Sequence, residues 1–295
     1  MADRLAKTAL IIPVHNRRAT TLQGLRSLRR INTSGLEVKI IVVDDGSSDG
    51  TSEAIRNEFP EVDLIAGDGS LHYAAGTNRG IEAAIAWQAD YVVTMNDDSI
   101  FHEDFLLRLI ETSSRFERSI VGSLLLLWDD PHLVFQVDPK WKPFQGGWVF
   151  PQDLTAFSVP AEPFEVQCLV GNCLLLPMRA IEENGPLDEV NFPFGWGDAQ
   201  LAMRMRKAGW RLLVDPRSRV WCEPNTYPKP LHTLKMSDRL SILLKDRRHP
   251  ANLQRQFKAL WHSAPSRFSA LVAFASYVGG LFLKALRLRS FGRKV

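Results

Sequence analysis

The chain has 295 residues, of which 45% are hydrophobic and 23% are charged, and its formal net charge is +3. These totals are typical of a globular protein with one or two domains, and the sequence contains no internal repeat and no low-complexity segment. The charge is uneven, because residues 229–295 contain 14 Lys or Arg and two Asp, which leaves 22 basic and 31 acidic residues in 1–228. An acidic body therefore precedes a basic tail.

Residues 1–7 lack the apolar core of a signal peptide, and the apolar run at 8–14 is too short to supply one. The three cysteines, Cys168, Cys173 and Cys222, form no Cys-x-x-Cys pair. An odd number without such spacing favours buried thiols in a reducing cytosol over a disulfide framework.

The first hundred residues alternate between apolar runs and helical patterns. Short apolar runs bounded by polar residues predict buried strands at Thr8–Val14, Val38–Val43, Val62–Ala66 and 91–95. Helices are expected between them, at about 18–30, Thr51–Phe59 and 76–89. This alternation predicts a parallel sheet flanked by helices.

The second hundred residues are less regular. We expect a helix at His102–Phe116 and two further segments of the sheet at Ser119–Trp128 and Val166–Pro177. A last helix is expected at Ala199–Ala208, with Gly209 as its C-terminal stop. Between them, Asp129–Pro163 is rich in proline and aromatic residues, and is either a functional lid or binding surface, or a β-hairpin packed on the sheet. Asp198 lies at or next to the N-terminus of the last helix, whose dipole should hold the pKa of its carboxyl low.

Two of the predicted strands end in acidic loops. Asp44 and Asp45 follow the second strand, and Asn96, Asp97 and Asp98 follow the fourth. The carboxyl ends of parallel strands form the ligand-binding edge of such a sheet, and carboxylate oxygens suit Mg²⁺ or Mn²⁺ bound together with a substrate phosphate. The alternative for 96–98 is a solvated loop that caps the next helix. The chain lacks Gly-x-Gly-x-x-Gly and Gly-x-x-x-x-Gly-Lys-Ser/Thr, which argues against a dinucleotide-binding fold and a phosphate-loop ATPase.

Together these motifs resemble those of a family 2 glycosyltransferase, of the rhamnosyltransferase-like type that builds bacterial surface polysaccharides. The matching segments follow the family's order, at 11–17, 42–51, 76–80, 95–98, 171–173, 185–189 and 196–198. The resemblance implies an α/β protein of the GT-A fold, with a mainly parallel central sheet flanked by helices. It places a catalytic domain at 1–228, with a nucleotide-binding half at 1–100 and an acceptor half at 101–228.

The same resemblance implies roles for single residues. Asp45 would hydrogen-bond the nucleobase of a donor, and Asp44 would shape that pocket. Asp98 would be the main metal ligand, and Asp198 would be the catalytic base. The remaining positions would bind the donor (Pro13, His15, Arg17, Asn78, Asn96, Asp97) or face the acceptor (Asp188, Trp196).

The chemistry explains why carboxylates are needed on two sides. A leaving nucleoside diphosphate gains negative charge, which Mn²⁺ or Mg²⁺ would neutralise, and the attacking hydroxyl must lose its proton to a carboxylate on the opposite side. We therefore expect a single displacement with inversion at the anomeric carbon. The sequence departs from the family where a further metal-binding His is common: Cys222 or Glu223 stands there, and His232 is a more distant candidate.

Residues 229–295 predict a helical basic tail. Leu240–Trp261 has the pattern of one amphipathic helix or a pair, and Phe268–Leu283 lacks charges but is shorter than the about 20 apolar residues that span a membrane. An apolar segment followed by basic residues favours attachment to an anionic membrane surface, the alternative being packing on the catalytic domain or a dimer partner. No nucleic-acid partner is expected, because aromatic residues are not interleaved with the charges.

These features predict an inverting glycosyltransferase that moves a sugar from a UDP- or dTDP-sugar to a hydroxyl of a glycan or lipid-linked glycan in cell-envelope polysaccharide synthesis. We expect it to be cytoplasmic and peripheral on the inner membrane, and a homodimer stays open. The alternatives are a non-catalytic nucleotide-sugar-binding subunit and a nucleotidyltransferase, although the latter needs a glycine-rich basic loop that residues 13–18 lack.

Overall fold

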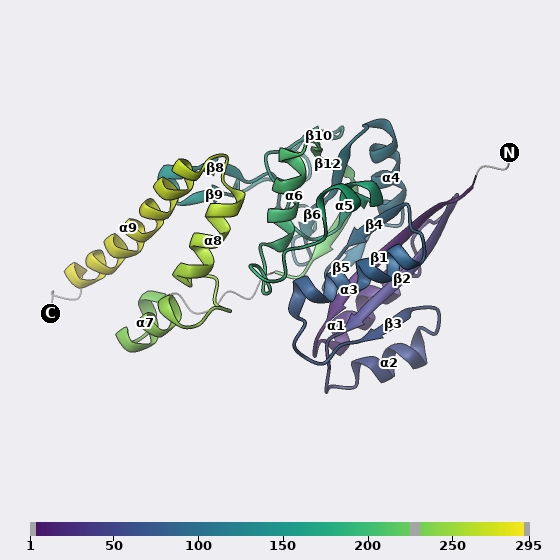
Figure 1. The fold of residues 1–295 in the computed structure, drawn as a ribbon, viewed down its shortest axis with the longest axis horizontal. Helices are drawn as coiled ribbons and strands as arrows, with labels where there is room; N and C mark the ends of the chain where they lie inside the picture. Colours follow the sequence, from purple (N-terminus) through teal and green to yellow (C-terminus); the bar gives the residue numbers. More distant parts are fainter. Residues whose placement is uncertain (1–3, 225–230, 292–295) are drawn as a thin grey trace. The chain divides into compact units, whose positions relative to one another are not determined.

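The computed structural model describes residues 4–224 and 231–291, apart from the side chains of residues 232 and 284–291 (Figure 1). The chain forms two compact units. The N-terminal unit comprises Met1–Asp138 and Pro151–Pro224, and the C-terminal unit comprises Pro139–Phe150 and Asn225–Val295.

The first half of the N-terminal unit is a parallel sheet. Its strands are β1 (Ala6–Val14), β2 (Leu36–Asp44), β3 (Asp63–Ala66) and β4 (Tyr91–Thr94). They lie in the order β4-β1-β2-β3, with every neighbouring pair parallel. Leu10, Ile11 and Ile41 in the central strands are fully buried. The alternation predicted from the sequence is confirmed, and the loops after β2 and β4 end at the same edge because these strands flank β1.

The sheet continues beyond β4 with mixed direction. β11 (Leu174–Pro177) runs antiparallel to both β4 and β6 (Ser119–Leu127), and β12 (Arg211–Cys222) pairs in parallel with β6. Three short strands complete it: β5 (Ser99–Phe101), β7 (Val134–Gln136) and β10 (Phe164–Glu165). The strand β12 carries Cys222 and Glu223 to the end of β5, where Cys222 pairs with Ser99.

Six helices of this unit connect the strands. They are α1 (Arg18–Leu28), α2 (Thr51–Glu58), α3 (His72–Ala86), α4 (Phe105–Arg115), α5 (Met178–Asn184) and α6 (Gly197–Lys207). The start predicted for α3 is wrong by four residues, since Gly76 and Gly80 lie inside the helix. A Cβ on Gly80 would overlap Ile11, and one on Gly76 would lie 3.1 Å from Cβ of Pro13. These glycines permit close packing of α3 on β1 and do not mark the start of the helix.

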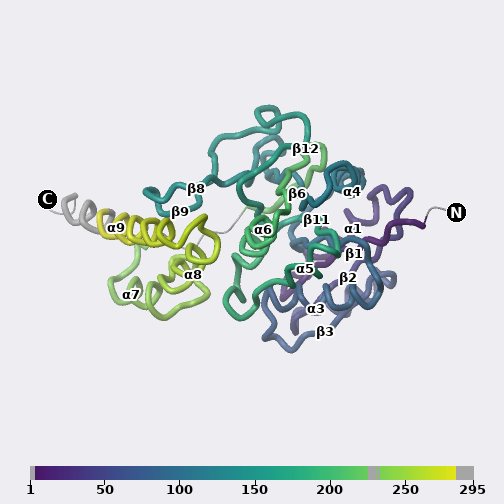
Figure 2. Tube along the Cα trace, turned by 45° about the horizontal axis from the view of Figure 1, so that its top comes forward, coloured from purple at the N-terminus to yellow at the C-terminus, as the bar shows by residue number. Residues whose placement is uncertain are grey.

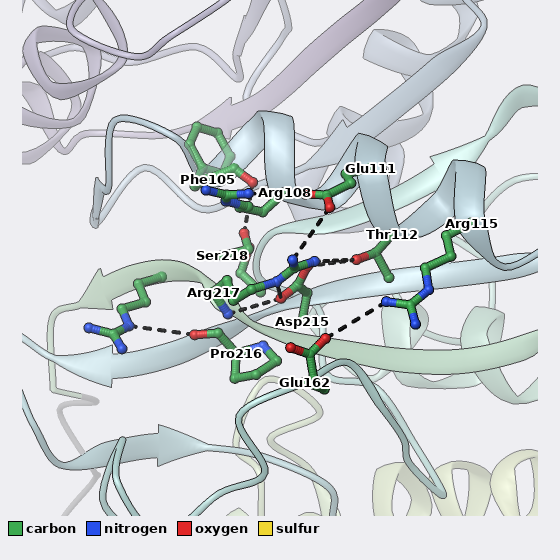
Figure 3. A network of polar contacts seen from close by, with 12 residues as sticks. Phe105, Arg108, Glu111, Thr112, Arg115, Glu162, Asp215, Pro216, Arg217 and Ser218 are labelled. Atoms are coloured by element: carbon green, nitrogen blue, oxygen red, sulfur yellow. Dashed lines mark hydrogen bonds and ion pairs between the residues drawn. The ribbon is translucent and has the colours of Figure 1, made fainter.

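A buried ion pair fixes the middle of β12 (Figure 3). The pairing register of β12 shifts between Asp215 and Arg219. Asp215 is fully buried, and its carboxylate accepts hydrogen bonds from Thr112 of α4 at 2.6 Å and from Nη2 of Arg217 at 2.9 Å. These bonds satisfy the buried charge and tie α4 to the bulge, after which β12 continues toward Glu223.

The C-terminal unit contains a small hairpin and three long helices. The hairpin is β8 (Lys140–Lys142), the 3₁₀ turn η1 (Pro143–Gln145) and β9 (Gly147–Val149); the 3₁₀ turn η2 (Leu231–Thr233), α7 (Met236–Leu244), α8 (Leu253–Ser263) and α9 (Arg267–Phe291) follow. The amphipathic basic segment predicted at Leu240–Trp261 is thus formed by a pair of helices, α7 and α8. Within the described residues, no helix is both long and apolar enough to cross a membrane.

The hairpin packs on the helices of its own unit. Nε1 of Trp141 donates to Ser269 of α9 at 2.5 Å, and Nε1 of Trp148 donates to Ser263 of α8 at 2.9 Å. Figures 1 and 2 show β8 and β9 in teal beside the yellow-green helices. Of the stretch Asp129–Pro163, β7 thus pairs with β6 in the sheet, whereas the β8–β9 hairpin packs its two indoles against α8 and α9. A role as a lid or binding surface stays a prediction.

Candidate active site

Three loops meet around Asp45, and we call them the Asp45 loops: residues 15–18, 44–51 and 67–72. The carboxylate of Asp45 accepts backbone hydrogen bonds from Gly69 at 2.8 Å, Leu71 at 3.2 Å and His72 at 2.9 Å. Nδ1 of His15 donates to the carbonyl of Asp45 at 2.6 Å. Asp45, predicted to contact a nucleobase, therefore holds the loop after β3 in place, and the exposed His15 ring lies beside it.

The first two of these loops are also bonded directly to each other. The side chain of Asn16 accepts the backbone N–H of Ser48 at 2.7 Å, and the backbone N–H of Asn16 donates to Ser47 Oγ at 2.8 Å. Asp44 accepts the backbone N–H of Ser47 at 2.9 Å and the hydroxyl of Ser52. Asp44 thus stabilises the loop by binding its backbone and Ser52, and its role in a nucleobase pocket stays a prediction.

The acidic corner consists of Asp97, Asp98 and Glu223, and Arg17 lies among them. Nε of Arg17 is 3.4 Å from Asp97, Nη1 is 3.4 Å from Asp98, and Nη2 is 2.8 Å from Glu223. The backbone N–H of Glu223 also donates to the carbonyl of Asp98 at 3.1 Å. Arg17 therefore pairs with a carboxylate 206 positions away in the chain as well as with the two that follow β4.

The negative charge of the acidic corner is only partly compensated by Arg17. Burial raises the pKa of Asp97 to about 6, with Arg17 opposing and Asp98 adding to the shift. Burial likewise raises the pKa of Asp98, where Arg17 again opposes and the charge of Glu223 adds. One guanidinium therefore does not offset three carboxylates, and the corner retains an affinity for further positive charge.

The carboxylate oxygens of Asp98 and Glu223 suit a hard divalent cation, and the guanidinium of Arg17 meets the same oxygens. Over the described residues, no group of three or more His, Cys, Asp or Glu is arranged around a common metal position. Cys222 is buried, its thiol accepts a hydrogen bond from Asn172 at 3.2 Å, and burial raises its pKa to about 12. Three residues are candidates for a further metal ligand. Glu223 faces Asp98, Cys222 is a protonated thiol, and the side chain of His232 lies outside the described residues.

Asp198 is the second residue of α6 and lies against Gly171. A Cβ on Gly171 would overlap the Asp198 carboxylate. Burial raises the pKa of Asp198, although the backbone amides of Ala199, Asp198 and Gly171 oppose the shift. The expected low pKa is therefore wrong in direction, because the loss of solvation outweighs the helix N-terminus.

The loop before β11 connects Asp198 with the acidic corner. Gly171 contacts Asp198, while the next residue, Asn172, accepts the backbone N–H of Asn96 at 3.0 Å and donates to Ser99 at 2.8 Å. Asn96 is the first residue of the loop that carries Asp97 and Asp98. The structure thus brings the predicted base position and the predicted metal position to two sides of one dipeptide.

Tyr73 is a site residue that the sequence analysis missed. Its hydroxyl donates to the carbonyl of Gly171 at 3.1 Å. Burial raises the pKa of Tyr73, and the charges of Asp198 and then Asp98 add to the shift. Tyr73 is therefore close enough to both carboxylates to respond to them. No sequence motif marks it, apart from its place one residue after the loop that Asp45 binds.

Two further predicted residues have structural partners. Asn78 donates to the carbonyl of Leu187 at 3.0 Å and to Glu189 at 2.7 Å, and accepts the backbone N–H of Leu187 at 3.0 Å. Asp188 accepts the backbone and side-chain N–H groups of Asn191 at 3.0 and 2.8 Å. The structure thus uses both to build the loop that leads to α6, and their direct contact with donor or acceptor stays a prediction.

Trp196 and Pro13 complete the set. Trp196 precedes α6 with a φ of 69°, a left-handed conformation, and its carbonyl accepts the backbone N–H of Gln200 at 2.8 Å. The segment before it packs on the start of α3, where the rings of Phe194 and His72 are 4.7 Å apart. Pro13 lies in β1 under Gly76. Pro13 and the segment before Trp196 therefore both pack on the first turns of α3.

Comparisons with known proteins agree with this geometry. Residues 9–131 match the model of the family described as Glycosyl transferase family 2. The chain is 29% identical over 204 residues to N-acetylglucosaminyl-diphospho-decaprenol L-rhamnosyltransferase of Mycobacterium tuberculosis, a match that covers 62% of this chain and 66% of that protein. It is 24% identical over 290 residues to the succinoglycan biosynthesis protein ExoA of Rhizobium meliloti, covering 94% and 82%.

Two solved structures share the fold at 14% identity. GalNAc-T7 with UDP, GalNAc and Mn²⁺ matches with a TM-score of 0.61 over 92% of this chain and 54% of that chain. The mannosyltransferase PcManGT from Pyrobaculum calidifontis, in complex with GDP-Man and Mn²⁺, matches with a TM-score of 0.53 over 98% and 80%. Residues 9–131 therefore resemble a glycosyl transferase family 2 domain, and the fold of the chain is GT-A.

Proposed function

We propose that the protein is an inverting glycosyltransferase that moves a sugar from a nucleoside-diphosphate donor to a hydroxyl of a glycan or lipid-linked glycan in cell-envelope polysaccharide synthesis. One observation carries the proposal: Gly171 contacts Asp198, and Asn172 binds the loop of Asp98. These bonds support a proton acceptor at Asp198 and a diphosphate-side carboxylate at Asp98, which attack opposite a leaving group would require.

In this proposal Asp198 is the general base. Burial raises its pKa, so its ionised form is a stronger proton acceptor than that of an ordinary aspartate. Tyr73 and the amide of Gly171 keep the carboxylate in place, and the acceptor hydroxyl would lie between Asp198 and the donor. Removal of its proton during attack gives a single displacement, which inverts the anomeric carbon.

The acidic corner would serve the leaving group. Asp98 and Glu223 would hold a divalent cation, Mn²⁺ or Mg²⁺, which when bound neutralises charge on the departing diphosphate. Arg17 supplies a second positive charge at the same place. Support for a metal comes from the donor atoms of the corner and from the two fold relatives, whose structures hold Mn²⁺.

The Asp45 loops would hold the nucleoside. Asp45 keeps residues 69–72 in a fixed arrangement, and the exposed ring of His15 lies next to it with Pro13 in the strand below. A base could stack on this ring and bond to the loop. The name of the mycobacterial relative supports a deoxyhexosyl donor and a lipid-linked acceptor, and UDP- and dTDP-sugars are the donors to screen first. Asp188 and Trp196 would face the acceptor.

Replacing Asp198 with Asn tests the proposal. We expect the variant to lose about 10²- to 10⁴-fold in turnover and to keep its affinity for the nucleotide, because a general base acts in the transition state. Asp153→Asn, at an exposed position, is the control for the same chemical change. NMR of the product should show the anomeric configuration opposite to that of the donor.

A product with retained configuration would contradict Asp198 as a simple base. If both proteins bind nucleotide but neither turns over any donor, the non-catalytic binding subunit becomes the better reading. Release of pyrophosphate instead of a nucleoside diphosphate would indicate the nucleotidyltransferase.

We also propose peripheral attachment to the cytoplasmic face of the inner membrane through the C-terminal unit. Large apolar side chains are exposed along α7 and α9, namely Met236, Leu240, Leu244, Phe268, Leu271, Val278 and Phe282. Apolar side chains on helices rich in basic residues suit an anionic lipid surface. Flotation with anionic vesicles should recover the wild type but not Phe268→Ser/Phe282→Ser, and equal recovery would contradict the proposal.

A further inference from the structure

The guanidinium of Arg17 is the cation that the acidic corner holds within this structure. It lies 2.8 Å from Glu223 and 3.4 Å from both Asp97 and Asp98, so its contact with Glu223 is the shortest. Asp97 is reached by a further hydrogen bond, from Thr21 at 3.3 Å. Arg17 therefore contacts the same oxygens of Asp98 and Glu223 that suit a divalent cation.

The side chain of Arg17 is partly exposed, and its backbone is held at the start of α1. The carbonyl of Arg17 accepts the backbone N–H of Thr21 at 2.9 Å, at the start of α1. Its side chain is 40% exposed, and that of Glu223 is 46% exposed. A long, half-exposed side chain on a fixed loop can leave its partners without unfolding the loop.

We propose that Arg17 is an internal counter-cation, which leaves Asp98 and Glu223 when a divalent cation binds them and then pairs through its freed guanidinium with the diphosphate of the donor. A guanidinium and a divalent cation compete for these oxygens, because positive charges a few ångströms apart repel each other. The planar guanidinium matches the oxygens of a phosphate group in geometry as well as charge.

This exchange links the metal to the donor. In the free protein Arg17 competes with the metal and lowers its affinity. Once the donor is bound, Arg17 has a new anionic partner and the competition ends, so metal and nucleotide bind cooperatively. The inference rests on the proposed function for the identity of the diphosphate.

Arg17→Met in the full-length protein tests the exchange, because Met removes the charge and keeps most of the length. Titration of Mn²⁺ without nucleotide, followed by electron paramagnetic resonance of the free ion, should show at least tenfold tighter binding in the variant. Calorimetric titration of UDP at saturating Mn²⁺ should show at least tenfold weaker binding. The two changes have opposite signs, which a loss of folding does not produce.

Arg30→Met is the control for the same chemical change, since Arg30 is exposed and lies outside the Asp45 loops and the acidic corner. We expect both affinities of this variant to stay within twofold of the wild type. Glu223→Gln is a second test: it removes the shortest partner of Arg17, and UDP should bind at least threefold more tightly in EDTA than it binds to the wild type.

Mn²⁺ affinity of Arg17→Met equal to or below that of the wild type overturns the proposal, and so does unchanged UDP affinity in Glu223→Gln. If the wild type binds UDP and Mn²⁺ together but Arg17→Met gains no Mn²⁺ affinity, the exchange alone is wrong. If the wild type binds no nucleoside diphosphate at any Mn²⁺ concentration, both the exchange and the proposed function are wrong.

Discussion

The Asp45 loops and the acidic corner are two acidic regions of the N-terminal unit, and they are held in different ways. In the Asp45 loops the carboxylate accepts three backbone amides at 2.8 to 3.2 Å. In the acidic corner two of the three contacts of Arg17 are 3.4 Å long, and they are made by a half-exposed side chain. Backbone amides cannot leave without a change of fold, whereas a side chain can.

This difference indicates a division of labour within the site. The Asp45 loops are ordered before any ligand arrives, which lowers the entropy cost of binding a nucleoside. The acidic corner carries uncompensated charge, which a cation can stabilise on binding. Asp198 resembles Asp45 in this respect, because backbone amides of Gly171 and of its own helix hold its carboxylate.

The largest effect is expected from Gly171→Ala. The added Cβ would overlap the Asp198 carboxylate, so one of the two must move. We expect turnover to fall by at least about 10²-fold, since a small displacement of a catalytic group has effects of this size. Affinity for UDP with Mn²⁺, measured by calorimetry, should change little.

Gly279→Ala is the control for this change, because a Cβ there meets no atom within 4 Å. It should leave turnover unaltered. Near-normal turnover of Gly171→Ala would show that Asp198 is not held against Gly171 in the active protein.

A smaller effect is expected from Asp45→Asn, which breaks the order of the Asp45 loops. One side-chain oxygen becomes an NH₂ group that faces a backbone N–H, so at least one charge-assisted hydrogen bond is lost, at a cost of about 2 kcal/mol in the free energy of unfolding. UDP affinity should fall about tenfold with it. Chemical denaturation and calorimetry measure the two quantities.

Asp68→Asn is the matched control, because Asp68 is an exposed residue whose carboxylate binds the neighbouring Ser70 and does not hold the three loops together through Asp45. Its UDP affinity should stay close to that of the wild type. Equal losses in both variants would mean that the loop as a whole, and not Asp45, controls binding.

The smallest effect is expected in the pH profile of kcat/KM, which reports the free enzyme. Asp198 acts as a base only when ionised, and its pKa is raised, so activity should fall on acidification at a higher pH than an ordinary aspartate would give. Burial raises the pKa of Asp97 to about 6, so this carboxyl also titrates above the range of an ordinary aspartate, and Asp97→Asn is measured alongside. If kcat/KM of this variant still falls on acidification, the fall is assigned to Asp198. If kcat/KM of the wild type does not fall at a higher pH than an ordinary aspartate would give, the raised pKa of Asp198 is contradicted.

Much of the fold could be predicted from local patterns. The strands β1, β2, β3 and β4 lie within two residues of their predicted bounds, and the helix that carries Asp198 does too. Short apolar runs and turn-forming loops specify such elements through interactions along a few residues. The predicted start of α3 is wrong because its glycines permit close packing on β1, and this packing is a tertiary contact that local patterns do not show.

The site was predictable in part. The acidic loops after β2 and β4 had to meet at one edge, because parallel strands align their ends. Tyr73 and the pairing of Arg17 with Glu223 were not predictable, since their partners lie 98 and 206 residues away. The packing of the Trp141 hairpin on α9 was missed for the same reason.

The sequence by itself determined which elements form and which carboxylates stand at their ends, because these depend on residue type and spacing. Only the tertiary structure decided how those carboxylates behave. It buried Asp198 enough to raise its pKa, turned Cys222 inward, and set Arg17 among three acids, because desolvation and charge pairing depend on what the fold brings near each group.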